Sequence, residues 1–227
     1  IQGLLNFLDM RYTHSGVLAS AMAFNKPVAK AIMAAAGIKV AEHRIVTYDQ
    51  FLNDNVMAPP YVVKPLNEGS SVGVWIVQVG DIFEPKKKNW VFGDRVMVER
   101  FIPGRELTVT VMGDRPLAVT EVMTTRDFYD YEAKYIAGGS KHIVPANIPK
   151  VIYEEALHIS LLAHKSLECR GISRVDIRYD GKNLYVLEVN TQPGMTPTSL
   201  APEQAAYLNI SFNELVIWLV ENAACDA

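Results

Sequence analysis

The chain has 227 residues, is 49% hydrophobic and 21% charged, and carries a formal net charge of -3. These values are ordinary for a globular protein and argue against disorder, and the small negative charge gives no reason to expect a nucleic-acid partner. No stretch approaches the ~20 apolar residues that a membrane span needs, and the two cysteines form no paired metal motif, so we expect a cytoplasmic protein with free thiols.

The first twenty residues predict a short apolar helix that runs into a turn-rich connection at 12–16. Ile1 is not an initiator residue, and no signal peptide precedes it. We therefore expect residues 1–16 to be the tail of a preceding domain.

A second helix is predicted from the sequence Asn25-Lys26-Pro27, with Asn25 as N-cap and an end at Gly37. A cation gains nothing from the dipole at the start of a helix. Lys26 is thus either a solvent-exposed lysine, which the local pattern favours, or a contact for phosphate.

Strands are predicted at residues 40–46, 61–65 and 74–79, with a loop at 66–73 joining the last two. Lys64 lies at the end of a buried apolar strand, which is costly unless its ammonium group has an anionic partner. The loop offers glycines and paired serines, which suit a phosphate cradle, although they also suit a hairpin with a polar tip.

Residues 96–109 predict a strand, a Pro-Gly break and a second strand. The segment 99–102 presents a carboxylate, an aromatic ring and free backbone, so it is a candidate purine hinge, with Glu106 placed for ribose hydroxyls. A plain hairpin is the alternative. The candidate nucleotide-binding residues here are Glu99, Arg100, Phe101, Ile102 and Glu106.

Strands at 115–123 and 141–144 bracket a polar and aromatic loop at 129–140, whose length is typical of a lid. An amphipathic helix is predicted at 150–168, and a similar pattern at 212–220 closes the chain.

Residues 174–190 predict a β-hairpin around an Asp-Gly turn. Alternation puts the side chains of Arg174, Asp176 and Arg178 on one face of the first strand. It groups those of Leu184, Val186, Glu188 and Asn190 on one face of the second. An odd-length turn would join these faces and bring two carboxylates and an amide oxygen together, a set of hard oxygen ligands suited to Mg²⁺. The alternative is an exposed hairpin with weak cross-strand ion pairs.

Five segments in series resemble the ATP-grasp superfamily and, within it, the D-alanine:D-alanine ligases. They read YTHSGVLASAMAFNK, VVKPLNEGSSVG, VERFIPGRELTV, FYDYEAKY and LEVNTQPGMTPTSL. The resemblance implies an α+β fold with two subdomains, 17–102 and 103–227, whose antiparallel sheets clasp ATP. It also implies that most of an N-terminal domain, which orients the first D-alanine in the family, is missing before residue 16.

The implied reaction is phosphorylation of one D-alanine by ATP, followed by attack of a second D-alanine on the acyl phosphate, in peptidoglycan precursor synthesis. A homodimer is implied only by the resemblance. The implied phosphate contacts are Lys26 and Lys64, and the implied ligands of two Mg²⁺ or Mn²⁺ ions are Asp176, Glu188 and Asn190. The implied catalytic residues are Arg174, Lys134, Tyr135, Ser70 and Gly194, and the implied receivers of the second D-alanine are Ser199 and Leu200.

The sequence departs from the family pattern at His14 and Gln192, neither of which is an implied catalytic position. Two alternatives stay open. One is a ligase that uses D-lactate or D-serine as second substrate, and the other is a non-catalytic ATP-binding module of the same fold.

Overall fold

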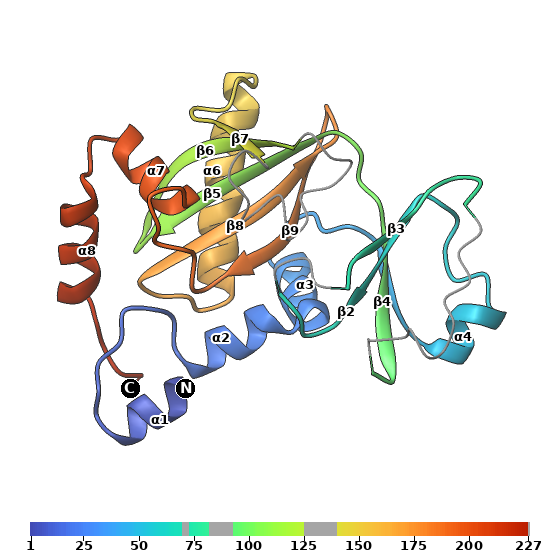
Figure 1. The fold of residues 1–227 in the computed structure, drawn as a ribbon, viewed down its shortest axis with the longest axis horizontal. Coiled ribbons are helices and arrows are strands. Elements are labelled where there is room, and N and C mark those ends of the chain that lie inside the picture. The colour runs from blue at the N-terminus through green and yellow to red at the C-terminus, as the bar shows by residue number, and fades with distance from the viewer. Residues whose placement is uncertain (70–72, 82–92, 125–139, 227) are drawn as a thin grey trace.

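The computed structural model describes residues 1–69, 73–81, 93–124 and 140–226. In these residues the chain is α+β, and its strands form two antiparallel sheets (Figure 1), as expected for the fold class. Residues 70–72 of the predicted phosphate loop and 129–139 of the predicted lid lie outside the described residues.

Three helices open the chain: α1 (Gln2–Phe7), α2 (Val17–Phe24) and α3 (Lys26–Ala35). The side chain of Asn25 accepts a hydrogen bond from the Val28 amide, so the predicted N-cap of α3 is confirmed. Gly37 follows the helix with φ +82°, a left-handed conformation that suits glycine at a helix end. The sequence pattern did not predict α2, which is apolar on most of its surface.

The smaller sheet has the strand order β1-β4-β2-β3, with all neighbours antiparallel. Its strands are β1 (His43–Thr47), β2 (Tyr61–Pro65), β3 (Trp75–Val77) and β4 (Arg95–Arg100). Helix α4 (Tyr48–Asn53), which begins with a capping box at Thr47, packs Phe51 into the apolar core of this sheet.

The larger sheet has the strand order β7-β6-β5-β8-β9. Its strands are β5 (Arg105–Met112), β6 (Arg115–Thr124), β7 (Ser140–Ile143), β8 (Ile172–Tyr179) and β9 (Leu184–Asn190). Helix α6 (Lys150–Ser166) covers one face and buries Ala156 and Ala163 against it, which confirms the predicted amphipathic helix. Helices α7 (Leu200–Tyr207) and α8 (Phe212–Glu221) pack at the far end of the sheet (Figure 1).

Helix α3 also belongs to the core of the larger sheet, because Ala29 and Met33 are buried in the same apolar cluster as β5, β8 and β9. The helix thus connects the two sheets. The division of the chain at residue 102 stays a prediction.

The hairpin β8–β9 differs from prediction in how its faces are built. Its loop has four residues, Asp180 to Asn183, rather than an odd number. A β-bulge lies between Asp176 and Ile177, since Asp176 pairs with Glu188 whereas Ile177 pairs with Val186, leaving Leu187 unpaired. The prediction that Leu184 and Val186 share a face with Glu188 is therefore wrong: the first two are buried in the core, while Glu188 and Asn190 are half-buried on the other face.

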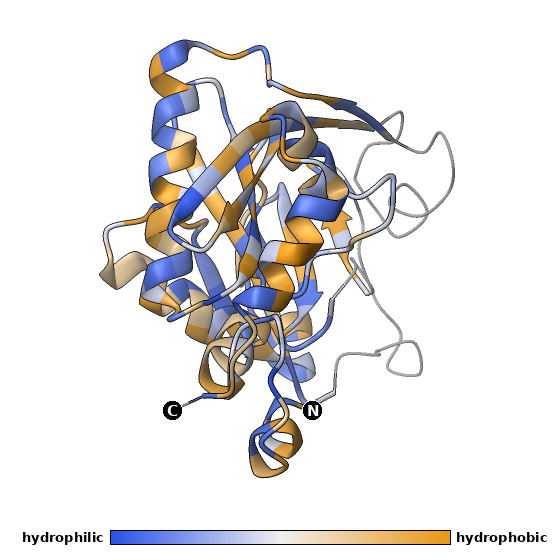
Figure 2. Cartoon of the chain, turned by 90° about the vertical axis from the view of Figure 1, so that its left-hand side faces the viewer, coloured by the Kyte–Doolittle hydropathy of each residue, from blue (hydrophilic) through white to orange (hydrophobic). Residues whose placement is uncertain are grey.

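Among the described helices, none has the length and apolar character to cross a membrane. In Figure 2 the helices carry blue hydrophilic positions between their orange hydrophobic ones, as expected for helices that are buried on one side only.

Candidate active site

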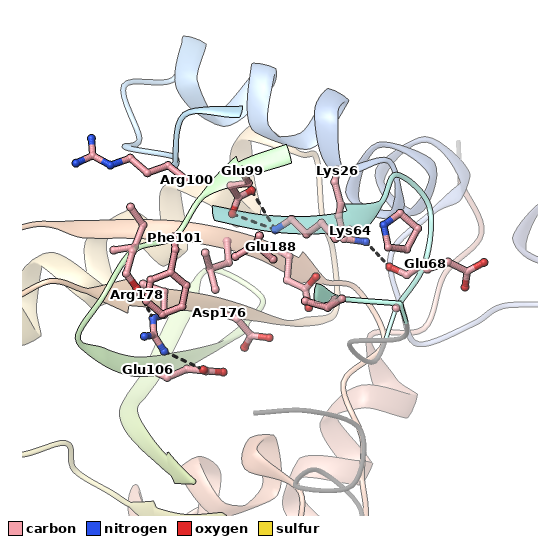
Figure 3. A pocket seen from close by; sticks show the side chains of 16 residues that line it. Lys26, Lys64, Glu68, Glu99, Arg100, Phe101, Glu106, Asp176, Arg178 and Glu188 are labelled. Atoms are coloured by element: carbon pink, nitrogen blue, oxygen red, sulfur yellow. Dashed lines mark hydrogen bonds and ion pairs between the residues drawn. The ribbon is translucent and has the colours of Figure 1, made fainter. Parts of the chain in front are cut away.

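A cavity that is open to solvent lies between the two sheets where β4 passes into β5. Figure 3 shows the side chains around it, which come from α3, both sheets and the connection between them. The charged residues that line it are Lys26, Lys64, Glu68, Glu99, Arg100, Glu106, Asp176, Arg178 and Glu188.

The carboxylate of Glu99 lies between two lysines at the back of this cavity. Nζ of Lys64 lies 3.0 Å from both carboxylate oxygens, and Nζ of Lys30 lies 3.0 Å from Oε2. Burial alone raises the pKa of Glu99, but the charges of Lys64 and Lys30 outweigh it and hold the pKa below its ordinary value. Lys64 therefore has the anionic partner that its strand position requires.

Lys26 is buried, with 9% of its surface exposed, so the local interpretation of a solvent-exposed lysine is wrong. Its backbone amide donates to Leu66 O, and its Nζ donates to Glu68 O (Figure 3). Burial lowers the pKa of Lys26, while the negative charge of Glu188 opposes that shift. The lysine is thus fixed at the start of α3 with its ammonium in the cavity wall.

Arg178 holds the connection between the sheets, and sequence reasoning did not assign it to the site. Its Nε donates to Ile102 O at 3.1 Å, and its Nη2 donates to Gly104 O at 3.1 Å. Its Nη1 lies 3.3 Å from Glu106, and its guanidinium lies 5.7 Å from the centre of the Phe101 ring. The signal was present in the sequence, because Arg178 shares a strand face with Arg174 and Asp176.

Gly104 is required in this connection. Its φ is +107°, and a Cβ atom at this position would lie only 2.2 Å from Tyr179 O. Arg100, by contrast, is exposed, and Figure 3 shows its guanidinium turned away from the cavity.

Asp176 and Glu188 lie directly opposite each other on β8 and β9, as the hairpin prediction required. Nε and Nη2 of Arg174 each donate a 2.8 Å hydrogen bond to a different oxygen of Asp176. Asn190 faces Arg174 across the strands, and its Oδ1 accepts from the Gln192 amide at 2.9 Å. The structure thus brings the predicted ligand set together on one surface.

This surface fits a divalent cation. Among the described residues the cavity is lined by five carboxylates and four cations, and two of the carboxylates, Asp176 and Glu188, lie opposite each other in the sheet, where like charges repel. Carboxylate and amide oxygens are suitable ligands for Mg²⁺. Within the described residues, no three His, Cys, Asp or Glu side chains converge as a metal site, so the predicted set depends on the Asn190 amide as its third ligand.

A second, wider cavity adjoins the first, and the two share Lys26, Glu68, Gly69 and Glu188 in their walls. It is bordered by α2 and by the loop 191–199. Ser199 and Leu200 line it where α7 begins, so both predicted residues lie at this cavity.

Gly194 and Ser199 are in close approach within this loop. A Cβ on Gly194 would lie 2.8 Å from Ser199 Oγ, and that oxygen accepts from the Thr196 amide at 3.0 Å. A side chain at position 194 would therefore require the hydroxyl of Ser199 to move.

The end of this loop is anchored to the larger sheet by Gln204 of α7, which is fully buried. Its amide oxygen accepts from the Thr110 amide at 2.7 Å, and its amide nitrogen donates to Thr108 O at 3.1 Å. Three predicted catalytic residues, Ser70, Lys134 and Tyr135, lie outside the described residues.

Comparison with known proteins gives consistent matches. Residues 32–221 match the family model described as D-ala D-ala ligase C-terminus. The protein named D-alanine–D-alanine ligase from Rhodospirillum rubrum is 56% identical over the whole chain, which spans 76% of that relative's length. The protein of the same name from Parvibaculum lavamentivorans is 55% identical with the same coverage.

Solved structures agree. The crystal structure of D-alanine–D-alanine ligase from Bacillus anthracis complexed with ATP superimposes with a TM-score of 0.79 at 29% identity, covering 97% of this chain and 73% of that one. The VanG D-Ala:D-Ser ligase from Enterococcus faecalis gives 0.81 at 26% identity, covering 97% and 67%.

Proposed function

Because the chain belongs to the D-alanine–D-alanine ligase family, an ATP-grasp family, we propose that the protein joins two D-alanine molecules in an ATP-dependent reaction. The product serves peptidoglycan precursor synthesis. The single observation that carries this proposal from the site itself is the pair of adjoining cavities, because the cavity between the sheets, which Lys26 and Lys64 line, meets a second one at Lys26 and Glu188.

The reaction has two steps. A carboxylate oxygen of one D-alanine takes the γ-phosphoryl group of ATP, and ADP leaves. The amine of the second D-alanine then attacks the acyl carbon, inorganic phosphate leaves, and the amine loses a proton. Negative charge builds up on oxygen atoms in both transition states. In a closed site, cations or hydrogen-bond donors have to stabilise this charge.

The proposed nucleotide site is the cavity between the sheets. Phe101 and Ile102 border the base, Glu106 faces the ribose, and Lys26 and Lys64 contact the phosphates. Arg178 donates hydrogen bonds to the backbone of the connection between β4 and β5, on which Phe101 and Ile102 lie. The backbone that borders the base is therefore held in a fixed shape. Glu99 contributes by holding Lys64, since its carboxylate contacts that lysine directly.

We propose that Asp176, Glu188 and Asn190 hold Mg²⁺, which the opposed carboxylates support. When bound, the metal neutralises phosphate charge during phosphoryl transfer. Arg174 lies beside these residues, and its guanidinium can stabilise developing negative charge on the acyl phosphate.

Ser199, Leu200 and Gly194 border the second cavity and are proposed to receive the second D-alanine. Because the fold is also similar to that of a D-Ala:D-Ser ligase, D-serine is the alternative second substrate. The test is therefore release of phosphate from ATP, together with detection of dipeptide, in the presence of D-alanine alone and of D-alanine with D-serine or D-lactate.

We expect D-alanine alone to support both phosphate release and formation of D-alanyl-D-alanine. Mixed products in excess over the D-alanine dipeptide would reassign the second substrate. Binding of ATP with no amino-acid-dependent turnover would contradict ligase function and favour a non-catalytic module.

A further inference from the structure

Lys30 is a fully buried lysine that does not line either cavity. Its side chain has no exposed surface, and it lies one helical turn after Lys26 on α3. Its Nζ lies 3.0 Å from Oε2 of Glu99 and 3.5 Å from the carbonyl oxygen of Ala41. Burying an ammonium group costs free energy of desolvation, and the ion pair with a buried carboxylate recovers only part of that cost. A role for Lys30 beyond packing is therefore to be sought.

The contact makes a row of three charges that runs from the core to the cavity. Lys30 is at the buried end, Glu99 is in the middle, and Lys64 is at the cavity wall. Without Lys30, the charges of Lys64 and Glu99 would cancel. With Lys30, the row carries one net positive charge, and the other described residues that line the cavity include more carboxylates than cations.

We infer that Lys30 is a positioning residue for nucleotide binding: by engaging Glu99 from behind, it leaves Lys64 able to act as a cation toward the phosphates. This rests on the proposed function, in which Lys64 contacts ATP phosphate. The same contact fixes the rotamer of Glu99, because two lysines reach its carboxylate.

Two ligands distinguish an effect of Lys30 on the charge of the site from an effect on the shape of the site: one that carries phosphate and one that does not. A residue that only supports the fold would affect the base and phosphate ends of a nucleotide alike. A residue that acts through the charge of Lys64 affects ligands that carry phosphate and leaves the nucleoside unaffected. Removing Glu99 as well as Lys30 leaves Lys64 with its full charge and no buried carboxylate.

The experiment compares binding of ADP and of adenosine, both with Mg²⁺ present, to the wild-type protein and to three variants. Lys30→Met replaces the amine by an apolar chain of similar length. Lys30→Met/Glu99→Gln removes both charges. Arg178→Lys disturbs the support of the connection between the sheets and serves as the matched contrast.

Lys30→Met is expected to weaken ADP binding about tenfold, as loss of one unit charge several ångströms away does in a medium of effective dielectric constant about 20. Its adenosine affinity stays at the wild-type value. In the double variant the ratio of ADP affinity to adenosine affinity returns to the wild-type value, whereas Arg178→Lys weakens ADP and adenosine by the same factor. The weakening caused by Lys30→Met also shrinks at high salt.

Equal loss of ADP and adenosine binding in Lys30→Met would overturn the inference, as would a double variant that binds ADP as weakly as the single one. If Lys30→Met does not fold, the double variant, which has no unbalanced buried charge, is used instead. Its ratio of ADP affinity to adenosine affinity is then compared with that of the wild-type protein. A wild-type protein that binds neither ligand would overturn the proposed function itself, and the inference with it.

Discussion

The hydroxyl of Thr108 on β5 donates a 2.8 Å hydrogen bond to Oδ1 of Asp176 on β8, directly opposite it in the sheet. Thr108 is buried, with 2% of its surface exposed, so the bond is shielded from water. Arg174 contacts both oxygens of the same carboxylate. The orientation of Asp176 is therefore set by two neighbours, as is usual for carboxylates that bind metal.

Thr108→Val tests this support. Loss of the hydroxyl is expected to raise the Mg²⁺ concentration for half-maximal activity by about 10- to 100-fold, the usual cost of removing such a neighbour of a ligand. The measurement is a Mg²⁺ titration of phosphate release. Thr108→Ser keeps the donor and should titrate like the wild type; equal shifts in both variants would point to packing instead.

Replacing the two opposed carboxylates should separate activity from stability. Glu188→Gln is expected to lower turnover by about 100-fold or more, since it removes a proposed ligand for the charge on phosphate. Its free energy of unfolding should stay within about 0.5 kcal/mol of wild type, because relief of the repulsion with Asp176 offsets the loss of the Glu188 charge near the buried Lys26.

Asp176→Asn serves as the comparison. It removes the carboxylate that the half-buried Arg174 contacts at 2.8 Å, and should cost about 1–3 kcal/mol of stability in addition to activity. Thermal unfolding and turnover, measured on both variants, decide the matter. If the Glu188→Gln variant is inactive and also strongly destabilised, the loss of activity comes from the loss of folding, and the proposed role of Glu188 in the reaction is refuted.

Gly194→Ala should impair the amino-acid site and spare the nucleotide site. The new Cβ would lie 2.8 Å from Ser199 Oγ, so Ser199 has to move. We expect a higher KM for D-alanine with an unchanged KM for ATP, measured by initial rates. Ser199→Ala and Gly194→Ala/Ser199→Ala should then behave alike, because without the hydroxyl the nearest atom of residue 199 is 3.6 Å away; a further loss in the double variant would contradict the clash.

His164 on α6 should make stability depend on pH. It is buried beside Ser173, with Nδ1 and Oγ 2.7 Å apart, and burial lowers its pKa from 6.5 to about 4. Because the folded-state pKa is the lower one, the folded protein resists protonation of this group. Stability is present in full above pH 6.5 and falls by about 3 kcal/mol as the pH drops to 4.

Denaturant unfolding between pH 7 and 4 measures this dependence. His164→Gln should flatten the curve over that range, whereas replacing His158, which is exposed on the same helix, should leave its slope unchanged. A wild-type curve with no slope between pH 6.5 and 4 would show that His164 does not have the lowered pKa.

Local signals in the sequence predicted the strands and most of the helices of the described residues, although not α2, α4 or α7. The N-cap Asn25 and the helix that follows it depend on contacts within a few residues, so they can be read from a short segment. The pairing of Asp176 with Glu188 was accessible for the same reason, because both lie on one hairpin.

Contacts between distant segments were not accessible in this way. Lys26 is buried because Leu66 and Glu68, some forty residues later, close over it. Lys30 meets Glu99 only because α3 packs beside the smaller sheet, and no local pattern marks a lysine as buried. The specific roles of the site residues came from the family resemblance and stay predictions.

The unpaired Leu187 divides β9 into two parts that respond differently to a change in length. Deleting Leu187 would leave the pairs on both sides of the bulge in register, and regular alternation would keep Glu188 on the face opposite the buried Val186. Deleting the paired Val189 would instead move Asn190 into a core position and away from the face that carries Glu188. The length of β9 is therefore constrained on the C-terminal side of the bulge, while the bulge itself is open to variation.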